Sequence, residues 1–513
     1  MEPTVDLRDP SLFGNDAAED EQEEVFSSYA LERPEVAEFL DTKQKLCIAR
    51  AYKGEGKTAL LRLTGTKIRH LDSDALVVAS TATALAPSLH IDDFSTWVRN
   101  WKESILGRLA SEIGSRIGHA WTDDAMSLVE EAERTGFRER SIVKAILRRL
   151  PIKVDVGPAS ISVGSVGEPG PSAPAAAVQR WSKNSAPIWL FFDDVDQNFQ
   201  NTPAQRAKVA SFFIACRELI NAIPELRIRA AIRPNVWTTI KMEFEALSHV
   251  EQYVYDLRWD ESSIRQLLAK RIEGALMRSG SWDGFTRTNP VNSWQRERKL
   301  IKAVLDDPMS WGKSVRPPHV LLYTLSKHRP RWVIELCKLA GRSAVEAERS
   351  RIARDDIFEH LETFGRRRIE DTVSEFRAQC PEVQELIAAF NREGEQFSTA
   401  ELTTLIKRKI LNHVNPQIVG VVAPRPIDVA AFLFQVGFIF GREELPNDEY
   451  RHISYSERPH LLSARTSLDE GLSWEIHPVF RQALELRDVA GKELPPPPRG
   501  RGRKRGRGGR RRG

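Results

Sequence analysis

Residues 45–63 read KLCIARAYKGEGKTALLRL, and this stretch decides the fold of the first half of the chain. A short apolar run over 45–51 leads into a glycine-rich turn, and a helical pattern starts at Thr58. The turn matches the fingerprint GxxxxGK[ST], whose backbone N–H groups face phosphates while the lysine and the hydroxyl serve the triphosphate and Mg²⁺. Its place between a strand and a helix N-terminus, which attracts anions, is the context this motif requires.

The loop departs from the fingerprint at its first position, where Ala51 replaces glycine. A side chain at this position favours a negative φ. A chance GKT sequence in an ordinary loop is the alternative to a phosphate-binding loop. The residues expected to contact bound ATP are Ala51, Lys53, Gly54, Glu55, Gly56, Lys57, Thr58 and Ala59.

The clearest buried strand covers 186–192 and ends in Asp193-Asp194. An acid at the tip of such a strand is where P-loop enzymes hold Mg²⁺, so Asp193 is predicted to bind the metal together with Thr58. Asp194 takes the position of the base that orients the attacking water. Because Asp is one methylene shorter than Glu, slow hydrolysis is expected. The alternative is that both acids only cap a turn after the strand.

Further apolar runs at 74–80, 226–233 and 250–259 alternate with helical patterns such as 203–223. Strands alternating with helices predict an α/β core with a parallel sheet covered on both faces, spanning 41–259. Within it, 92–150 is interpreted as a helical insertion. The stretch 151–180, rich in Gly, Pro and Ser, is interpreted as flexible.

The remaining chain divides by its patterns. Residues 1–40 are predicted to be an acidic, solvated arm. Residues 260–360 are helical throughout by pattern and predict a helical lid. Residues 361–490 combine helices with short strands at 438–440, 449–455 and 474–477, which suggests a C-terminal winged-helix-like unit.

Three residues outside the loop are candidates for nucleotide contact. Arg233 follows the strand at 226–233, where its guanidinium could reach the γ-phosphate, or could simply lie on the surface. In the run 328–331 that opens the next helix, Arg331 or alternatively Arg329 could reach the nucleotide from the lid, or could only cap that helix or lie on the surface. His477 is a lone histidine for which packing is the alternative.

The net charge of +4 conceals a basic end. Residues 499–513 carry nine cations and no acid, so the rest of the chain sums to −5. Residues 491–513, a proline run followed by arginine and glycine, cannot build a core and are predicted to be disordered. Such a tail could bind nucleic acid or an acidic protein surface, or could serve only solubility.

Several classes of protein are disfavoured by composition. The four cysteines are far apart and lack the spacing of zinc or redox sites, which predicts a reducing compartment and no structural metal. No apolar run approaches the ~20 residues that span a bilayer. The N-terminus lacks the pattern of a signal peptide, so a cytoplasmic protein without membrane contact is expected.

With both nucleotide motifs placed, the chain resembles the AAA+ and STAND groups of P-loop ATPases, relatives of origin-recognition ATPases and NTP-driven switches. More narrowly, it resembles bacterial stand-alone ATPases with an acidic N-terminal segment, represented here by Leu12-Phe-Gly-Asn15 and Glu19-Asp20. The resemblance covers most of the chain and runs through AYKGEGKTALL, WLFFDDVD, AAIRP, LRWDESSIRQLLAKRI, HRPRWVIELCKLA and WEIHPVFRQAL.

The resemblance implies a sheet with a helical lid. It places phosphate binding on Lys57 and Thr58, and positioning of Mg²⁺ and water on Asp193 and Asp194. It also implies a first sensor at Arg233 and a second at Arg331. The alanine at the start of the loop and the lack of a convincing arginine finger leave ring assembly open.

The sequence is compatible with three hypotheses for function. The first is an ATP-dependent switch that signals its state to a protein partner, with relatives acting in phage defence or DNA maintenance, and with oligomerisation open. The second is a DNA-associated ATPase that grips nucleic acid through the winged helix and the basic tail. The third is a nucleotide-binding scaffold with negligible turnover.

Overall fold

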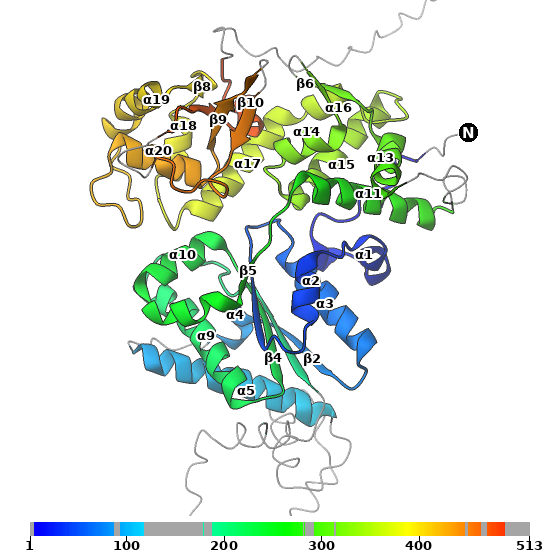
Figure 1. The fold of residues 1–513 in the computed structure, drawn as a ribbon, viewed down its shortest axis with the longest axis vertical. Helices are drawn as coiled ribbons and strands as arrows, with labels where there is room; N and C mark the ends of the chain where they lie inside the picture. The colour runs from blue at the N-terminus through cyan, green and yellow to red at the C-terminus, as the bar shows by residue number, and fades with distance from the viewer. Residues whose placement is uncertain are drawn as a thin grey trace, which may run out of the picture. The chain divides into compact units, whose positions relative to one another are not determined.

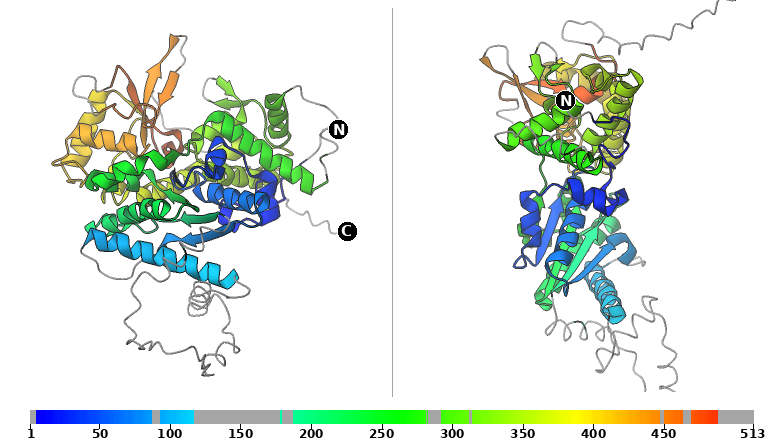
Figure 2. Two further views of the ribbon diagram at one scale, coloured as in Figure 1. Left: turned by 60° about the horizontal axis from the view of Figure 1, so that its bottom comes forward. Right: turned by 90° about the vertical axis from the view of Figure 1, so that its right-hand side faces the viewer.

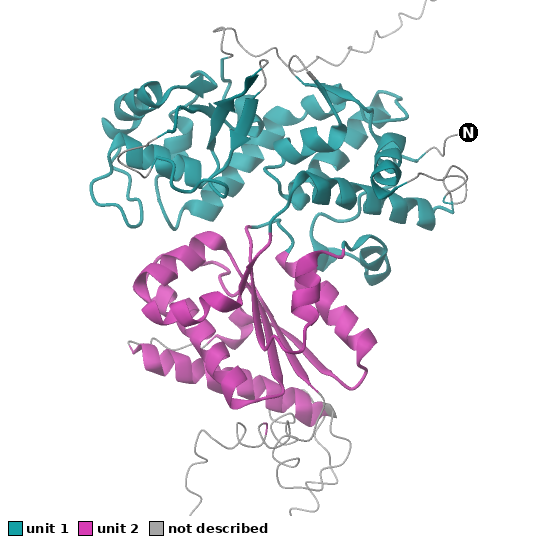
Figure 3. Cartoon of the chain, viewed as in Figure 1, with its two compact units in different colours: residues 1–31, 53–56, 258–513 teal, residues 32–52, 57–257 magenta. Residues whose placement is uncertain are grey.

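The computed structural model describes residues 5–86, 93–116, 178, 187–280, 282, 292–311, 314–446, 450–462 and 469–487. The chain forms two compact units (Figure 3). The sheet unit comprises 32–52 and 57–257, and the helical unit comprises 1–31, 53–56 and 258–513. The short segment 53–56, in the middle of the glycine-rich loop, is therefore grouped with the helical unit.

A parallel sheet forms the centre of the sheet unit (Figure 1). Its five described strands lie in the order β2-β3-β4-β1-β5, and each neighbouring pair is parallel. Their bounds are β1 Leu46–Arg50, β2 Leu76–Thr81, β3 Ile188–Asp193, β4 Leu226–Ile232 and β5 Val254–Asp256. The predicted α/β fold with a P-loop-type parallel sheet is confirmed.

Alternate residues of the strands enter two separate cores. On one face, Cys47 and Phe191 pack with α2 (Pro34–Leu40) and α3 (Lys57–Leu71). On the other face, Ile48 and Phe192 pack with α5, α9 and α10. Their bounds are Phe94–Arg116, Pro203–Ala222 and Pro234–Glu243, and α5 runs alongside the sheet (Figure 2). Period-two alternation with apolar residues on both sides is the pattern of a sheet covered by helices on both faces.

The last strand of the sheet is shorter than its sequence suggests. A strand was expected over 250–259, but two 3-10 helices, Glu245–His249 and Glu251–Tyr253, occupy part of this stretch. Trp237 and Lys241 of α10 bind the Glu251 carboxylate over 2.8 and 3.2 Å, which holds this turn. The expected strand is thereby reduced to β5.

The first part of the helical unit is mostly helical, as predicted. Its helices after residue 260 are α11 Glu261–Arg278, α13 Ser293–Val304, α14 Pro318–Leu325, α15 Pro330–Glu346 and α16 Arg354–Phe358. The expectation that 260–360 is helical throughout is wrong at one place, where β6 (Met309–Trp311) and β7 (Ser314–Arg316) form an antiparallel pair. Pro308 and Pro317 flank this pair, and proline is not tolerated in a helix interior.

The C-terminal part of the helical unit combines helices with a small antiparallel sheet of order β10-β9-β11-β8. The helices are α17 Leu361–Phe376, α18 Val383–Ala388, α19 Thr399–Ile406, α20 Pro426–Gln435 and α21 Pro478–Arg481, with a π turn at Lys407–Leu411. The strands are β8 Gln396–Phe397, β9 Ile439–Glu444, β10 Tyr450–Ile453 and β11 Ser473–Ile476. This arrangement is the winged-helix-like part that the sequence suggested.

Helices α17 and α21 approach each other closely. A Cβ added at Gly365 of α17 would overlap the carbonyl oxygen of Val479 and lie 3.0 Å from the Cβ of Ala483. Only glycine fits at this contact, so the backbones of the two helices pack directly against each other.

The N-terminal segment differs from the expected solvated arm. Leu12, Phe13 and Tyr29 are all at most 4% exposed. Arg271 of α11 donates to the carbonyl oxygens of Phe13 and Asn15, and its guanidinium lies 3.9 Å from the centre of the Tyr29 ring. The expectation is wrong for these residues, because the segment carries apolar side chains that pack around a buried arginine. The division between the units falls at residue 31 rather than 40.

Three expected segments fall wholly or largely outside the described residues. Of the helical insertion at 92–150, the structure describes α5; the rest of it, the segment 151–180 apart from Val178, and the tail 491–513 lie outside the described residues. Among the residues that are described, no helix has the length and apolar character needed to cross a membrane.

Candidate nucleotide-binding site

The glycine-rich loop follows β1 and ends at the first residue of α3. Gly54 and Gly56 have φ values of 84° and 93°, a backbone conformation that residues with a side chain rarely adopt. Ala51 is absent from the described residues with positive φ, a conformation that its Cβ disfavours. Its N–H donates to the Ile232 carbonyl of β4 over 3.1 Å. The alanine therefore serves as the last residue of the strand, and the loop turns only beyond it.

The ammonium of Lys57 closes the loop within the sheet unit. It donates to the carbonyl oxygens of Ala51 and Tyr52 over 2.7 and 3.1 Å. Both acceptors are neutral carbonyls, so the positive charge of Lys57 is not neutralised by these contacts. The lysine is thus held at the start of α3, where the helix dipole also favours an anion.

Thr58 and Asp193 are brought together as the sequence predicted. The Thr58 hydroxyl donates to a carboxylate oxygen of Asp193 over 2.5 Å, at the carboxyl end of β3. A hydroxyl and a carboxylate at hydrogen-bond distance offer the oxygen ligands that Mg²⁺ prefers.

Asp194 has an unusual backbone conformation. Its φ is 54°, and its N–H donates to the Asp193 carboxylate over 2.9 Å. Positive φ at a residue other than glycine is uncommon and costs energy, and such residues cluster at functional sites. The turn directs the two neighbouring carboxylates differently, since only that of Asp193 bonds to Thr58.

Arg233 lies at the end of β4, directly before α10, and is tied to Asp196. Its N–H and its Nε both donate to one carboxylate oxygen of Asp196 over 2.8 Å. The Asp196 side chain is 5% exposed and that of Arg233 is 21% exposed. The sequence placed Arg233 at a strand end but gave no signal that Asp196 would hold it.

The middle of the loop is held by residues of the helical unit. The Lys53 N–H donates to Glu375 of α17 over 3.2 Å, and Arg329 donates to the Lys53 carbonyl over 3.3 Å. The Arg331 N–H donates to the Gly54 carbonyl over 3.2 Å, and the Trp259 ring N–H to the Glu55 carbonyl over 2.8 Å. Each of these contacts engages the loop backbone.

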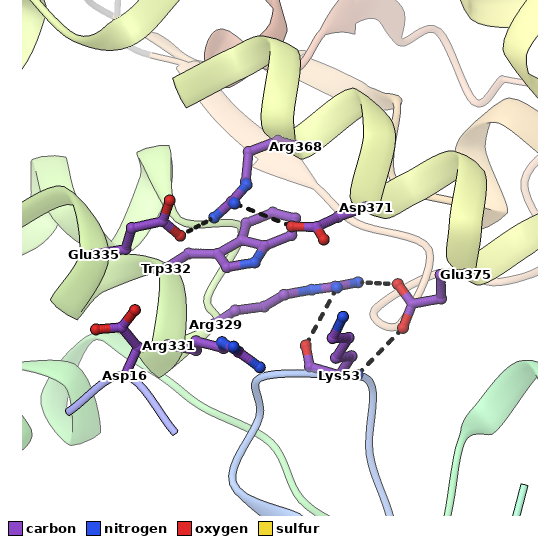
Figure 4. Close-up of a pocket in the computed structure, with 9 residues that line it drawn as sticks. All are labelled: Asp16, Lys53, Arg329, Arg331, Trp332, Glu335, Arg368, Asp371 and Glu375. Atoms are coloured by element: carbon purple, nitrogen blue, oxygen red, sulfur yellow. Dashed lines mark hydrogen bonds and ion pairs between the residues drawn. The ribbon is translucent and has the colours of Figure 1, made fainter. Parts of the chain in front are cut away.

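A cavity of about 220 Å³ opens beside this segment in the helical unit (Figure 4). Within the described chain, no hydrogen bond or ion pair engages the side-chain cations of Lys53 and Arg331, both of which line it. Two cations without acidic partners suit a cavity that receives an anion. The lining residues are Asp16, Lys53, Arg329, Arg331, Trp332, Glu335, Arg368, Asp371 and Glu375.

Several of these residues were missed by sequence reasoning. Glu375 lies 322 residues from Lys53 in the chain, and Asp16 reaches the cavity from the N-terminal segment, where it pairs with Lys338 over 2.8 Å. No local pattern marks either acid. Of the lining residues, Lys53 and Arg331 were expected at the nucleotide, and Arg329 had been an alternative to Arg331.

His477 has a structural environment. It is 3% exposed, and its Nδ1 accepts the Val479 N–H over 3.2 Å at the start of α21. Burial, together with nearby positive charges, lowers the pKa of His477 well below its usual value, so the ring is neutral at neutral pH. It does not line the cavity.

The parallel sheet, the glycine-rich loop between β1 and α3, and Thr58 against the acid that ends β3 together define a P-loop nucleotide-binding fold. No protein-family model matches the chain, and no curated protein matches it.

Solved structures similar to this chain include a Walker-type ATPase, an ORC2 protein and a Cdc6p. A Walker-type ATPase of Pyrococcus abyssi is 13% identical, with a TM-score of 0.36, over 86% of this chain and 97% of the other. The ORC2 protein of Aeropyrum pernix, solved with ADPNP and ADP, is 11% identical with a TM-score of 0.39, over 93% and 96%. Cdc6p of Pyrobaculum aerophilum is 12% identical with a TM-score of 0.31, over 90% and 99%.

Proposed function

We propose that this protein binds MgATP at the loop 51–58 and hydrolyses it slowly, so that the bound nucleotide acts as a switch. The observation that carries the proposal is the 2.5 Å contact between Thr58 and Asp193 at the end of the glycine-rich loop. In this proposal Lys57 and the loop N–H groups bind the phosphates, and Thr58 and Asp193 hold Mg²⁺. ATP and Mg²⁺ are the two ligands.

Three further residues complete the proposed chemistry. Asp194 orients the attacking water, and its short side chain is the reason for slow turnover. Arg233 senses the γ-phosphate from the end of β4. Arg331 does so from α15, and the contact of its N–H with Gly54 supports this role because it fixes the arginine to the loop itself.

The nucleotide state would be passed on through the C-terminal part to a protein partner, in a signalling or phage-defence setting. A second candidate function is a DNA-associated ATPase. The winged-helix-like arrangement favours it, since such units commonly place a helix in the DNA groove, and a basic tail would add phosphate contacts. The same tail could instead bind an acidic protein surface.

The test is ATP binding and phosphate release by the intact protein and by Lys57→Ala. The matched control is Lys67→Ala. Lys67 lies on the same helix α3, and its only described ion pair is with the exposed Glu32. We expect Lys57→Ala to abolish ATP binding and Lys67→Ala to retain it. ATP binding by Lys57→Ala as tight as in the parent would refute the proposal.

The two candidates separate when the assay is repeated with duplex DNA at two salt concentrations. A protein shortened to end at Glu493 shows what the tail contributes. DNA that neither binds nor changes turnover excludes the DNA-associated function. Binding that disappears in the shortened protein and falls steeply with salt would assign the affinity to the basic tail. ATP binding without any turnover would leave a nucleotide-binding scaffold.

A further inference from the structure

A buried ion pair forms hydrogen bonds with the backbone of the glycine-rich loop. Arg329 and Glu375 meet over 2.8 Å, with side chains that are 6% and 3% exposed. The other Glu375 oxygen accepts the Lys53 N–H over 3.2 Å, and another nitrogen of Arg329 donates to the Lys53 carbonyl over 3.3 Å. The pair therefore engages both polar backbone groups of one loop residue (Figure 4).

The charges of this pair are kept despite burial. Burial raises the pKa of Glu375, but the charge and hydrogen bond of Arg329, together with the Lys53 N–H, outweigh it and lower that pKa. A buried ion pair is costly to form and is weak evidence for stability by itself. Its retention beside the loop therefore calls for another explanation.

A second ion pair in the same cavity offers a comparison. Arg368 and Glu335 also meet over 2.8 Å. The guanidiniums of Arg329 and Arg368 lie 4.5 and 4.6 Å from the centre of the Trp332 ring. The two pairs share their chemistry and their aromatic neighbour. Of these two ion pairs, only that of Arg329 and Glu375 has described hydrogen bonds to the loop backbone.

Lys53, the residue bound by this pair, comes directly before the first turn of the loop. Gly54, with φ of 84°, follows Lys53, and its carbonyl accepts the Arg331 N–H. Fixing Lys53 sets the point from which the loop turns. It also occupies the Lys53 N–H, so the phosphates are left to the N–H groups further along. A loop already ordered before its ligand arrives spends less binding energy on ordering.

We propose that Glu375 and Arg329 are positioning residues that hold the Lys53 backbone and keep the loop in its phosphate-binding conformation before nucleotide binds. This inference rests on the proposed function and concerns the regulation of the same site. Glu375 belongs to α17, whose backbone packs directly against α21. The Lys53 N–H is therefore bound by a residue of the C-terminal part of the chain.

The test compares Glu375→Gln and Glu375→Leu with the control Glu362→Gln in the full-length protein. Glu362 lies on the same helix α17, pairs with the exposed Arg366 and does not line the cavity. Hydrogen exchange of the amides of 52–57 is measured without nucleotide, ATP affinity is measured by calorimetry, and thermal unfolding is recorded for each variant. Glutamine keeps an acceptor for the Lys53 N–H, whereas leucine removes it. We expect exchange to rise in the order parent, Gln, Leu, and ATP affinity to fall about tenfold or more in Leu and less in Gln.

Glu362→Gln should leave both the loop exchange and the ATP affinity at the parent values, whatever its effect on thermal unfolding. Equal loop exchange in Glu375→Leu and Glu362→Gln would overturn the inference, as would faster exchange with unchanged ATP affinity. If Glu375→Leu does not fold, the near-isosteric Gln variant decides by the same two readouts. A parent protein that binds no ATP would refute the proposed function itself, whereas ATP binding insensitive to Glu375 would refute the inference alone.

Discussion

The Thr58 hydroxyl lies 2.5 Å from the Asp193 carboxylate, although 135 residues separate the two in the chain. If these groups share one Mg²⁺, Asp193→Asn should lose the gain in ATP affinity that Mg²⁺ provides. It should also reduce phosphate release about 100-fold or more, because metal coordination supplies several kcal/mol of charge stabilisation. Calorimetry with Mg²⁺ or with EDTA measures the first effect. The exposed Asp74, on the turn before β2, provides the control Asp74→Asn; an equal Mg²⁺ response in both variants would contradict the assignment.

Arg233 and Arg227 lie at opposite ends of β4 and allow a matched comparison. Arg227 bonds only to carbonyl oxygens of Thr42 and Pro224 among its described hydrogen bonds, whereas Arg233 is tied to Asp196. We expect Arg233→Ala to slow phosphate release about tenfold or more with ATP affinity nearly unchanged, because a sensor stabilises charge during the reaction. Arg227→Ala should leave turnover intact. Equal rates for the two variants would show that Arg233 is only a structural residue.

Gly14 tests whether the N-terminal segment is part of the folded unit. It has φ of 64°, and a Cβ there would lie 2.6 Å from Glu21 and 2.7 Å from Arg271. Gly280 has nearly the same φ, 68°, but a Cβ there meets nothing within 4 Å. Both alanine variants carry the same backbone strain, so Gly14→Ala should lose about 2 kcal/mol more stability through overpacking. Urea unfolding measures the difference; equal losses would mean that the segment does not pack as described.

We expect the folded protein to lose stability in acid because the pKa of Glu475 is lowered on folding. This buried carboxylate receives hydrogen bonds from His452 over 2.9 Å and from Arg442 over 3.3 Å, as well as from Arg481. Burial raises the pKa of Glu475, but the hydrogen bond from His452 and the nearby cations outweigh this and lower it from 4.5 to about 2.

The unfolded chain takes up a proton at Glu475 below about pH 4.5, while the folded protein resists protonation down to about pH 2. The stabilisation, at most about 3 kcal/mol, is therefore complete above pH 4.5 and lost as the pH falls toward 2. Glu475→Gln should be less stable at neutral pH and should lack this part of the acid dependence. Glu444→Gln, which removes an exposed partner of Arg442, should retain it. Chemical unfolding at several pH values distinguishes them.

The sequence predicted what is encoded locally. The strand before Ala51, the turn at Gly54 and the helix after Thr58 follow from periodicity and from the conformational freedom of glycine. The acid-tipped strand at 188–193 was equally visible, because a run of large apolar residues ending in Asp193 has few other uses in a parallel sheet.

The contacts that hold the site were not predictable in the same way. Glu375 and Trp259 reach the loop from distant parts of the chain, and Glu375 sits in a helix whose pattern resembles any amphipathic helix. The partner of Arg233 was also invisible, since a charge near a strand end has many possible neighbours. Such pairs depend on tertiary packing, which a single sequence does not reveal.

The close contact at Gly365 limits where this chain can be cut into separately folding fragments. Cutting the chain after α16 would remove Glu375 together with the helix that carries it, and cutting after α17 would uncover the face that meets Val479. The glycine-rich loop and the C-terminal part are therefore not independent modules. A C-terminal part moved into another protein would therefore need both α17 and α21, because Gly365 and Val479 fit each other closely.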